Sequence, residues 1–302
     1  MKQNQLFHRP RHWLLVAVVS LLIAEGGVRT FGLVDFPLYE ANAQIGYIPA
    51  ANQQGSFLNK NDWQFNALHM GAPAFEPNPE RDVLLLGDSL VLGGNPYRAP
   101  ERLGPSLQTL MQVKGQLGQV WPIAAGSWAL RNELAFLRLN PQVPSSVKAV
   151  VLVLNSGDFE SASSWSCELT HPRTRPTVAL WYLFNKYVYA YERCGDIPAN
   201  LQVQPGNLAE ELQAFMTVYG AKTTFILYPG KDEQADSAIE AKGFAAGEAL
   251  LQAAGATRIV HLQQDARWQS HLYKDGIHPT AKGNLVLAQV IVDALNLHQH
   301  PK

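Results

Sequence analysis

Apolar and polar residues alternate in blocks from residue 82 to the C-terminus. Short, continuously apolar runs predict strands that are buried on both faces, and they lie at 83–86, 120–125, 149–154, 223–227 and 258–262. The intervening segments have helical spacing and predict helices at 103–113, 130–139, 208–219, 235–254 and 281–295. About five buried strands separated by helices predict an α/β domain whose parallel sheet is covered on both faces.

The N-terminal segment contains an apolar run, 13–24, that follows three basic residues, Lys2, Arg9 and Arg11. This run is shorter than the ~20 residues of an ordinary membrane-spanning helix and matches the apolar region of a signal peptide. No small-x-small cleavage site follows it. We therefore interpret residues 1–34 as an uncleaved signal anchor or transmembrane helix.

Two alternatives for this segment stay open: a cleaved signal, and an amphipathic or buried helix of a cytosolic protein. Glu25 and Arg29 are four residues apart, so they could pair on a helix as it leaves the bilayer. In both export interpretations the basic end stays in the cytoplasm. The main domain then lies on the periplasmic, extracytoplasmic side of the membrane.

Residues 35–80 and 159–200 do not follow the strand–helix alternation. The first segment is rich in Pro, Gly, Asn and Gln, so we expect an irregular linker with short strands that packs partly on the domain formed by 81–302. In the second, the spacing from 178 to 191 is that of an amphipathic helix, which we interpret as a cap over the core. A helix lying on the membrane and direct contact with a sugar are the alternatives.

Composition and charge narrow the class of protein. The chain has 302 residues, of which 47% are hydrophobic, which is enough for one sizeable core. With 24 basic and 25 acidic residues the net charge is −1, so no basic field favours nucleic acid.

Cys167 and Cys194 lack zinc-site spacing. In an oxidising compartment they could form a disulfide, and two buried free thiols are the alternative.

Polar residues follow several of the predicted strands. Because parallel sheets bind ligands beyond the carboxyl ends of their strands, these residues are expected to meet. Ser89 follows the first strand, while Asp275 and His278 precede the last helix. A serine hydroxyl is a weak nucleophile that needs a base and a group to orient that base. The pattern predicts Ser89 as nucleophile, His278 as base and Asp275 as the orienting carboxylate.

An oxyanion hole is the remaining requirement for acyl transfer. The backbone N–H groups of Ser89 and Gly126 are natural donors, because both residues directly follow strands. A side-chain amide after the third strand would be a third donor, and Asn155 is the candidate.

These motifs together resemble those of the SGNH/GDSL hydrolases. Residues 83–93 (VLLLGDSLVLG) resemble the first block of the family, residues 275–279 (DGIHP) resemble its last block, and Gly126 resembles the glycine of the second. The resemblance covers about residues 82–296. It implies a flavodoxin-like, three-layer α/β/α fold without a metal or cofactor, and a triad of Ser89, Asp275 and His278.

The third block departs from the family pattern, which reads Gly-x-Asn-Asp. Here Gly157 stands where the asparagine is expected, and Asn155 comes two positions early. Either Asn155 supplies the amide from a shifted register, or the third donor is a backbone N–H, such as that of Gly157, or is missing. The loss of one donor costs about 10²–10³ in rate.

The resemblance also suggests a substrate class. Exported, anchored enzymes of this kind are similar to those that add or remove acyl groups on surface or exported polysaccharides, which implies an ester hydrolase or O-acyltransferase. The alternatives are a non-catalytic carbohydrate-binding or scaffold subunit of an envelope polysaccharide assembly, and a lipase or phospholipase. Aromatic and arginine side chains suit a sugar ring and an anionic group, and the candidate substrate contacts are Asn95, Trp128, Asn132, Trp165 and Arg173.

Overall fold

Five parallel strands form the centre of the protein. The computed structural model describes residues 8–95, 97–116, 118–189 and 194–296. The strands are β5 (Val83–Gly87), β6 (Val120–Ala124), β7 (Ala149–Leu154), β8 (Thr223–Leu227) and β9 (Ile259–His261). They pair in the order β6-β5-β7-β8-β9, and every neighbouring pair is parallel. Each residue of β5, β7 and β8 is buried, as the continuous apolar runs predict.

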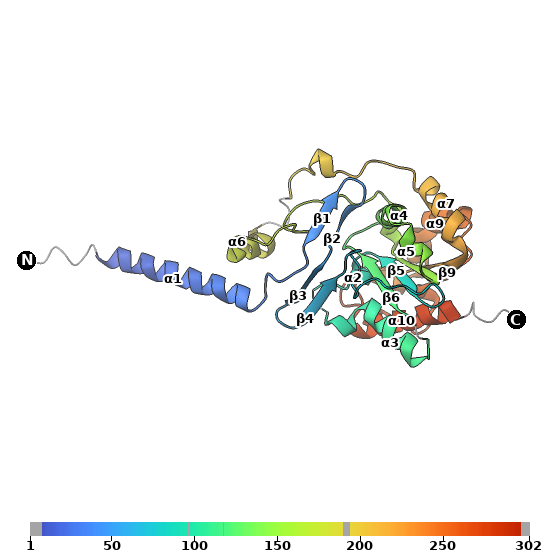
Figure 1. The fold of residues 1–302 in the computed structure, drawn as a ribbon, viewed down its shortest axis with the longest axis horizontal. Helices are drawn as coiled ribbons and strands as arrows, with labels where there is room; N and C mark the ends of the chain where they lie inside the picture. The colour runs from blue at the N-terminus through green and yellow to red at the C-terminus, as the bar shows by residue number, and fades with distance from the viewer. Residues whose placement is uncertain (1–7, 96, 117, 190–193, 297–302) are drawn as a thin grey trace, which may run out of the picture.

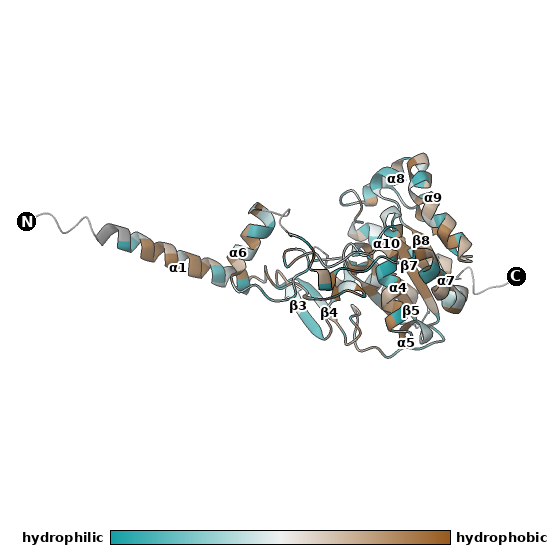
Figure 2. Cartoon of the chain, turned by 90° about the horizontal axis from the view of Figure 1, so that it is seen from above, coloured by the Kyte–Doolittle hydropathy of each residue, from teal (hydrophilic) through white to brown (hydrophobic). Residues whose placement is uncertain are grey.

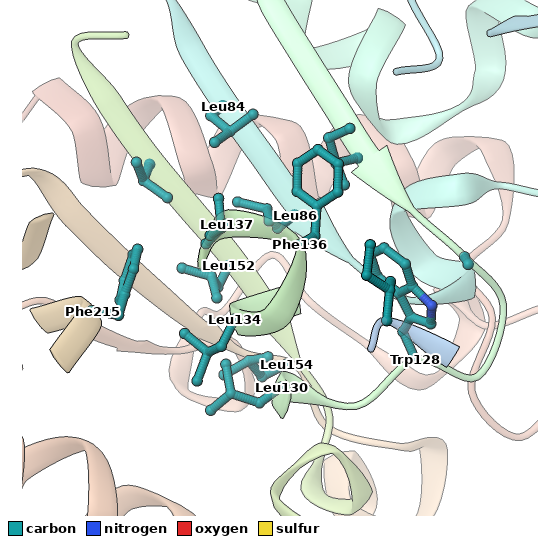
Figure 3. Close-up of a cluster of buried hydrophobic side chains, with 14 of the residues drawn as sticks. Leu84, Leu86, Trp128, Leu130, Leu134, Phe136, Leu137, Leu152, Leu154 and Phe215 are labelled. Atoms are coloured by element: carbon teal, nitrogen blue, oxygen red, sulfur yellow. The ribbon is translucent and has the colours of Figure 1, made fainter. Parts of the chain in front are cut away.

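Helices cover both faces of this sheet, so the predicted three-layer α/β/α architecture is confirmed. One face packs on α3 (Leu103–Val113) and α10 (Ala281–Asn296). The other packs on α4 (Leu130–Leu139), α7 (Leu208–Tyr219) and α9 (Ser237–Ala253). Successive side chains of a strand point to opposite faces, so Leu84 and Leu86 of β5 join Leu134 and Phe136 of α4 in the cluster drawn in Figure 3.

The helix predicted over 235–254 is confirmed as α9, which begins two residues later, and the short helix before it was not predicted. The chain forms α8 (Lys231–Ala235) and then α9, with a break at Asp236. The Asp236 carboxylate accepts hydrogen bonds from the N–H groups of Ala238 and Ile239, so it caps α9 and starts a new helix. Short helical turns complete the domain: α5 (Gln142–Ser145), η1 (Ala99–Glu101), η5 (Gly220–Lys222), η6 (Leu262–Gln264) and η7 (Ser270–Leu272).

The short strands expected within residues 35–80 form two antiparallel hairpins. β1 (Tyr39–Asn42) pairs with β2 (Gly46–Pro49), and β3 (Gln53–Phe57) pairs with β4 (Asn61–Phe65). Figure 1 shows both hairpins between the N-terminal helix and the sheet domain. Every residue of β2 is buried, so this hairpin is part of the main core rather than a loose linker.

The N-terminal helix α1 (His8–Thr30) extends away from the body of the protein (Figures 1 and 2). Residues Arg11–Thr30 are long and apolar enough to cross a membrane, a test that a signal sequence would also pass, and none of this span is buried. That exposure disagrees with the alternative of a buried helix. Glu25 and Arg29 form the expected ion pair, at 2.6 Å, whereas Lys2 lies outside the described residues.

The segment 159–200 crosses from the sheet to α1 and back. It contains η2 (Ser156–Phe159) at its start, α6 (Ala179–Phe184), a π-helical turn η3 (Asn185–Tyr189) and η4 (Ala199–Leu201), and a disulfide joins Cys167 to Cys194. The interpretation of its helix as a cap over the core is corrected here. Its buried residues, Ala179 and Tyr182, pack on Val34 and Phe36 in a separate small cluster. Tyr191 lies outside the described residues.

Gly87 lets the chain turn tightly from β5 into the helix that follows. A methyl group on its Cα would lie 2.5 Å from Cγ2 of Val91 and 3.1 Å from the carbonyl oxygen of Val153. Both neighbours are buried, so neither has free space to move into.

We therefore expect Gly87→Ala to lower the free energy of unfolding by about 1–3 kcal/mol, as overpacking does elsewhere. Urea unfolding of the full chain in detergent would measure it. Gly71→Ala is the matched control, because its new methyl group would meet no atom closer than 3.6 Å. Equal stability of the two variants would contradict the close packing described here.

Candidate active site

Ser89 lies at the carboxyl edge of the sheet, at the start of the short helix α2 (Ser89–Leu92). The carboxylate of Asp88 accepts a hydrogen bond from the N–H of Leu90 at 2.8 Å and caps this helix. Gly93 ends it in the left-handed conformation, with φ of 74°. Because Ser89 is the first helical residue, its N–H has no helical carbonyl behind it.

The structure brings together the three residues predicted as a triad. Nε2 of His278 lies 3.0 Å from Oγ of Ser89. Nδ1 of the same ring lies 2.9 Å and 3.1 Å from the two carboxylate oxygens of Asp275. These distances are those of a nucleophile, a base and the group that orients the base.

The carboxylate of Asp275 also holds its own loop. It accepts hydrogen bonds from the N–H groups of Ile277 at 3.0 Å and His278 at 2.8 Å. Partial burial alone would raise the pKa of Asp275, but these two N–H groups and the His278 ring lower it to about 2. Asp275 is therefore ionised at any pH near neutrality.

Two buried tyrosines hydrogen-bond to the backbone of the loop that carries His278 and hold it in place. The hydroxyl of Tyr228, just beyond β8, donates to the carbonyl of Ile277 at 2.6 Å. The hydroxyl of Tyr97 donates to the carbonyl of Pro279. The imidazole is thus positioned from two different elements rather than by its own loop alone.

Gly126 follows β6 and contacts the first hairpin. The hydroxyl of Tyr47 donates to the Gly126 carbonyl at 2.5 Å, and the ring of His171 packs on that of Tyr47 with centroids 3.9 Å apart. Burial lowers the pKa of His171 to about 4. Ser127 adopts a positive φ of 61°, which is uncommon for a residue with a side chain, and its carbonyl accepts from Oγ of Ser163. These contacts hold the Gly126 turn.

The side-chain amide of Asn155 is hydrogen-bonded to the carboxylates of Asp88 and Asp158. Its Nδ2 lies 3.2 Å from Oδ2 of Asp88 and 2.9 Å from Oδ1 of Asp158, and its Oδ1 accepts from the N–H of Gly157 at 2.8 Å. Both amide hydrogens and the Gly157 N–H thus have partners. Either residue could act as an oxyanion donor only after releasing these bonds.

Three buried carboxyl groups lie close behind Ser89, and sequence reasoning missed them. Asp88, Glu133 and Asp158 are at most 5% exposed. Burial raises the pKa of Asp88 to about 6 and the pKa values of Glu133 and Asp158 well above their ordinary range. Within the described residues, neither carboxyl oxygen of Glu133 has a hydrogen-bond partner. The signal was present, since Glu133 lies on the apolar face of α4 with Leu130, Leu134 and Leu137.

Three of the five candidate substrate contacts have structural roles instead. Trp128 and Trp165 are buried, and their indole N–H groups bond to backbone carbonyls. Asn132 is buried and connects the first hairpin to the loop at Ser163. Arg173 is exposed, packs 4.0 Å above the Trp165 ring and pairs with Glu168.

Asn95, the remaining candidate, borders a cavity beside the catalytic turn. This cavity of about 100 Å³ is also lined by Leu92, Gly94, Phe36 and Lys186. A larger cavity of about 580 Å³ shares part of its wall and extends toward α3, and the shared residues are Trp63, Phe65, Leu92 and Arg102. Among the described residues no cluster of three or more His, Cys, Asp or Glu side chains could hold a metal ion.

Comparisons with known proteins give only remote likenesses. No protein-family model and no curated protein matches the chain. Among solved structures, an α/β hydrolase from the metagenome of Lake Arreo, Spain, is 13% identical with a TM-score of 0.45, over 72% of this chain and 96% of the other. A lipase/acylhydrolase from Enterococcus faecalis is 13% identical with a TM-score of 0.45, over 74% and 98%. An acetylxylan esterase from Geobacillus stearothermophilus is 13% identical with a TM-score of 0.41, over 73% and 96%. Likeness at this level transfers no activity or substrate to this chain.

The buried acid on α4 gives a test by pH. A carboxyl group whose pKa is raised by folding binds more protons when folded, so stability falls as the pH rises above 4.5, its ordinary pKa. Each such group contributes a slope of at most about 1.4 kcal/mol per pH unit. We expect Glu133→Gln to remove one such contribution, measured by urea unfolding at several pH values between pH 4.5 and neutrality.

Glu76→Gln is the control for this experiment, because Glu76 is exposed. It should leave the slope of stability against pH unchanged. A Glu133→Gln slope equal to that of the unsubstituted protein would show that the Glu133 carboxyl is not protonated in the folded state.

Proposed function

We propose that the protein is a serine-dependent ester hydrolase or O-acyltransferase. The observation that carries this proposal is the alignment of Ser89, His278 and Asp275, in which Nε2 of His278 lies 3.0 Å from Oγ of Ser89. A serine hydroxyl that meets an imidazole oriented by a carboxylate is equipped for nucleophilic attack on an acyl carbon.

The reaction follows from the positions of these groups. His278 takes the proton of Ser89 through Nε2 while Oγ attacks the ester carbonyl. We assign the oxyanion that forms to the N–H groups of Ser89 and Gly126, because the two residues follow neighbouring parallel strands, β5 and β6; one such donor is worth about 3–4 kcal/mol. His278 then returns the proton to the departing alcohol, leaving an acyl group on Ser89. Water completes hydrolysis, whereas a sugar hydroxyl completes transfer.

The substrate we propose is an acyl group on a surface or exported polysaccharide, and the place of action is the outer side of the membrane. Three features support this: the apolar span Arg11–Thr30, the Cys167–Cys194 disulfide, which suits an oxidising compartment, and the resemblance of the motifs. The larger cavity, which is lined by Leu92 at the end of α2, combines aromatic walls, Trp63 and Phe65, with Arg102. That combination suits a sugar.

Two other functions are each favoured by one observation. A non-catalytic carbohydrate-binding subunit is favoured by the Asn155 amide, which is bonded to Asp88 and Asp158 and leaves the oxyanion hole without a third donor. A lipase is favoured by the membrane span of α1. Activity on p-nitrophenyl esters of increasing chain length separates the candidates, since a lipase prefers long chains and a binding subunit cleaves none.

We expect Ser89→Ala to abolish hydrolysis of p-nitrophenyl acetate and labelling by a fluorophosphonate probe, because the acyl-accepting oxygen is gone. Ser145→Ala serves as the control, since Ser145 is exposed and lies on α5, before β7. Turnover by Ser89→Ala equal to that of the control would end the proposal.

A second prediction concerns the orienting carboxylate. Asp275→Asn keeps the shape of the side chain but removes the charge and favours the wrong histidine tautomer, so kcat should fall by about 10⁴-fold. Asp265→Asn provides a comparison at a carboxylate outside the triad, paired with Arg267. A fall of similar size in both variants would indicate a folding defect rather than a role for Asp275.

A further inference from the structure

The segment 178–189, which we name the aromatic strip, exposes an unusual amount of apolar surface. The exposed fractions of its exposed apolar side chains range from 42% for Phe184 to 71% for Val188, and they include 61% for Trp181 and 70% for Tyr187. The ring of Phe184 stacks with Trp181 at 5.7 Å and with Tyr189 at 6.1 Å, so the surface is continuous. Contiguous exposed apolar surface marks an interaction site.

The other side of the aromatic strip is attached to the protein. Ala179 and Tyr182 are buried against Val34 and Phe36. Lys186 is the one charged residue between 178 and 189. Its ammonium group packs over the rings of Phe36 and Tyr182 and donates to the Tyr182 hydroxyl at 3.3 Å. The same ammonium group lies 6.0 Å from the centroid of the Tyr187 ring, and every exposed residue from 178 to 189 is aromatic or aliphatic.

The N-terminal anchor holds the aromatic strip directly. The carboxylate of Glu25 accepts hydrogen bonds from the N–H groups of Ala179 at 2.8 Å and Leu180 at 2.9 Å, at the start of α6. Arg29 donates to the carbonyls of Pro176 and Thr177 at 3.0 Å and 2.8 Å. Figure 2 shows α6 beside the C-terminal part of α1. Two side chains of α1 therefore fix the strip to it.

This attachment determines how deep the strip lies once α1 crosses a bilayer. The 20 residues of Arg11–Thr30 span about 30 Å, which equals the ~30 Å thickness of the hydrocarbon core. Glu25 precedes Thr30 by five residues, so it lies ~7.5 Å below the end of the helix. The start of α6, bonded to Glu25, must lie at the same depth.

We propose that the aromatic strip inserts into the headgroup and upper acyl region of the outer leaflet, as a second membrane contact beside α1. This inference rests on the membrane anchoring included in the proposed function. Trp and Tyr are enriched at this depth because their rings are apolar and their N–H and O–H groups reach water. Lipid is the occupant because the strip is hydrogen-bonded to α1, whose apolar side chains are exposed, and because every exposed residue of the strip is aromatic or aliphatic.

The position of the strip also affects the candidate active site. Lys186 of the strip and Phe36 beneath it line the cavity that Leu92, Gly94 and Asn95 border. One wall of this cavity is therefore the inner side of the membrane-contacting segment. With both contacts in place, the catalytic domain is held at a fixed height, and its cavity opens close to the membrane surface.

Labelling of single cysteines in the full chain, reconstituted in phosphatidylcholine vesicles, tests the insertion. The environment-sensitive fluorophore NBD would be attached at Tyr187→Cys without reductant, so that the Cys167–Cys194 bond stays closed. We expect blue-shifted emission and loss of intensity with lipids spin-labelled near the headgroup. Val18→Cys in α1 reports the anchor, and should be quenched by lipids spin-labelled deep in the chain. Val113→Cys, 78% exposed at the end of α3, is the aqueous control.

Each other outcome overturns the assignment in a recognisable way. If the label at Val18 is quenched by lipid but that at Tyr187 is as open to aqueous iodide as that at Val113, the anchor stands and the strip does not insert. Shielding from iodide without lipid quenching means that protein, such as a second copy, covers the strip. If the label at Val18 is not quenched, the anchor fails and the inference fails with it. Hydrolysis of p-nitrophenyl acetate by the same preparations reports the catalytic proposal separately.

Discussion

The contact between Ser89 and His278 requires two residues 189 positions apart in the chain to lie at one edge of one sheet. Parallel pairing meets this requirement, because every strand then ends at the same edge. β5 lies between β6 and β7, so the turn after it is held from both sides, and Gly87 allows α2 to start at once. The loop before α10 is docked by Tyr228 and Tyr97. The contact between Ser89 and His278 thus depends on the order of the strands as well as on the two loops.

The sheet and its helices were predictable because burial on both faces leaves a continuous apolar run, and a covering helix leaves a periodic one. The short helix α8 was not predicted, because its five residues are too few to show a helical period. Contacts between segments that are distant in the chain produce no repeating pattern in the sequence, so they could not be predicted from it. The hydrogen bond from Tyr47 to Gly126 joins a hairpin to the end of β6, and the packing of His171 on Tyr47 joins a third segment. The triad was predictable because the family resemblance, rather than periodicity, marks its residues.

Two aspartates near the same serine have opposite environments. Asp275 is half exposed and receives N–H donors, so its pKa is held near 2, whereas burial raises the pKa of Asp88 to about 6. Behind the serine, Glu133 and Asp158 are buried with raised pKa values, and a neutral form of these acids avoids placing like charges together in a poorly polar region. The side-chain amide of Asn155 lies between Asp88 and Asp158 and donates a hydrogen bond to each of them.

The Cys167–Cys194 disulfide closes a loop of 27 residues that contains α6 and rests on only a small buried cluster. In the chain-entropy description, closing a loop of this length removes unfolded conformations worth about 3–4 kcal/mol. Hydrogen bonds of Glu25, Arg29 and Arg175 also hold this loop, and thiol oxidation adds to the order that they give it. Oxidation needs an oxidising compartment, so the loop would reach its final shape only after the chain has crossed the bilayer. Maturation of this protein would then have a fixed sequence of events: translocation first, cystine formation second, and settling of the domain onto the lipid last.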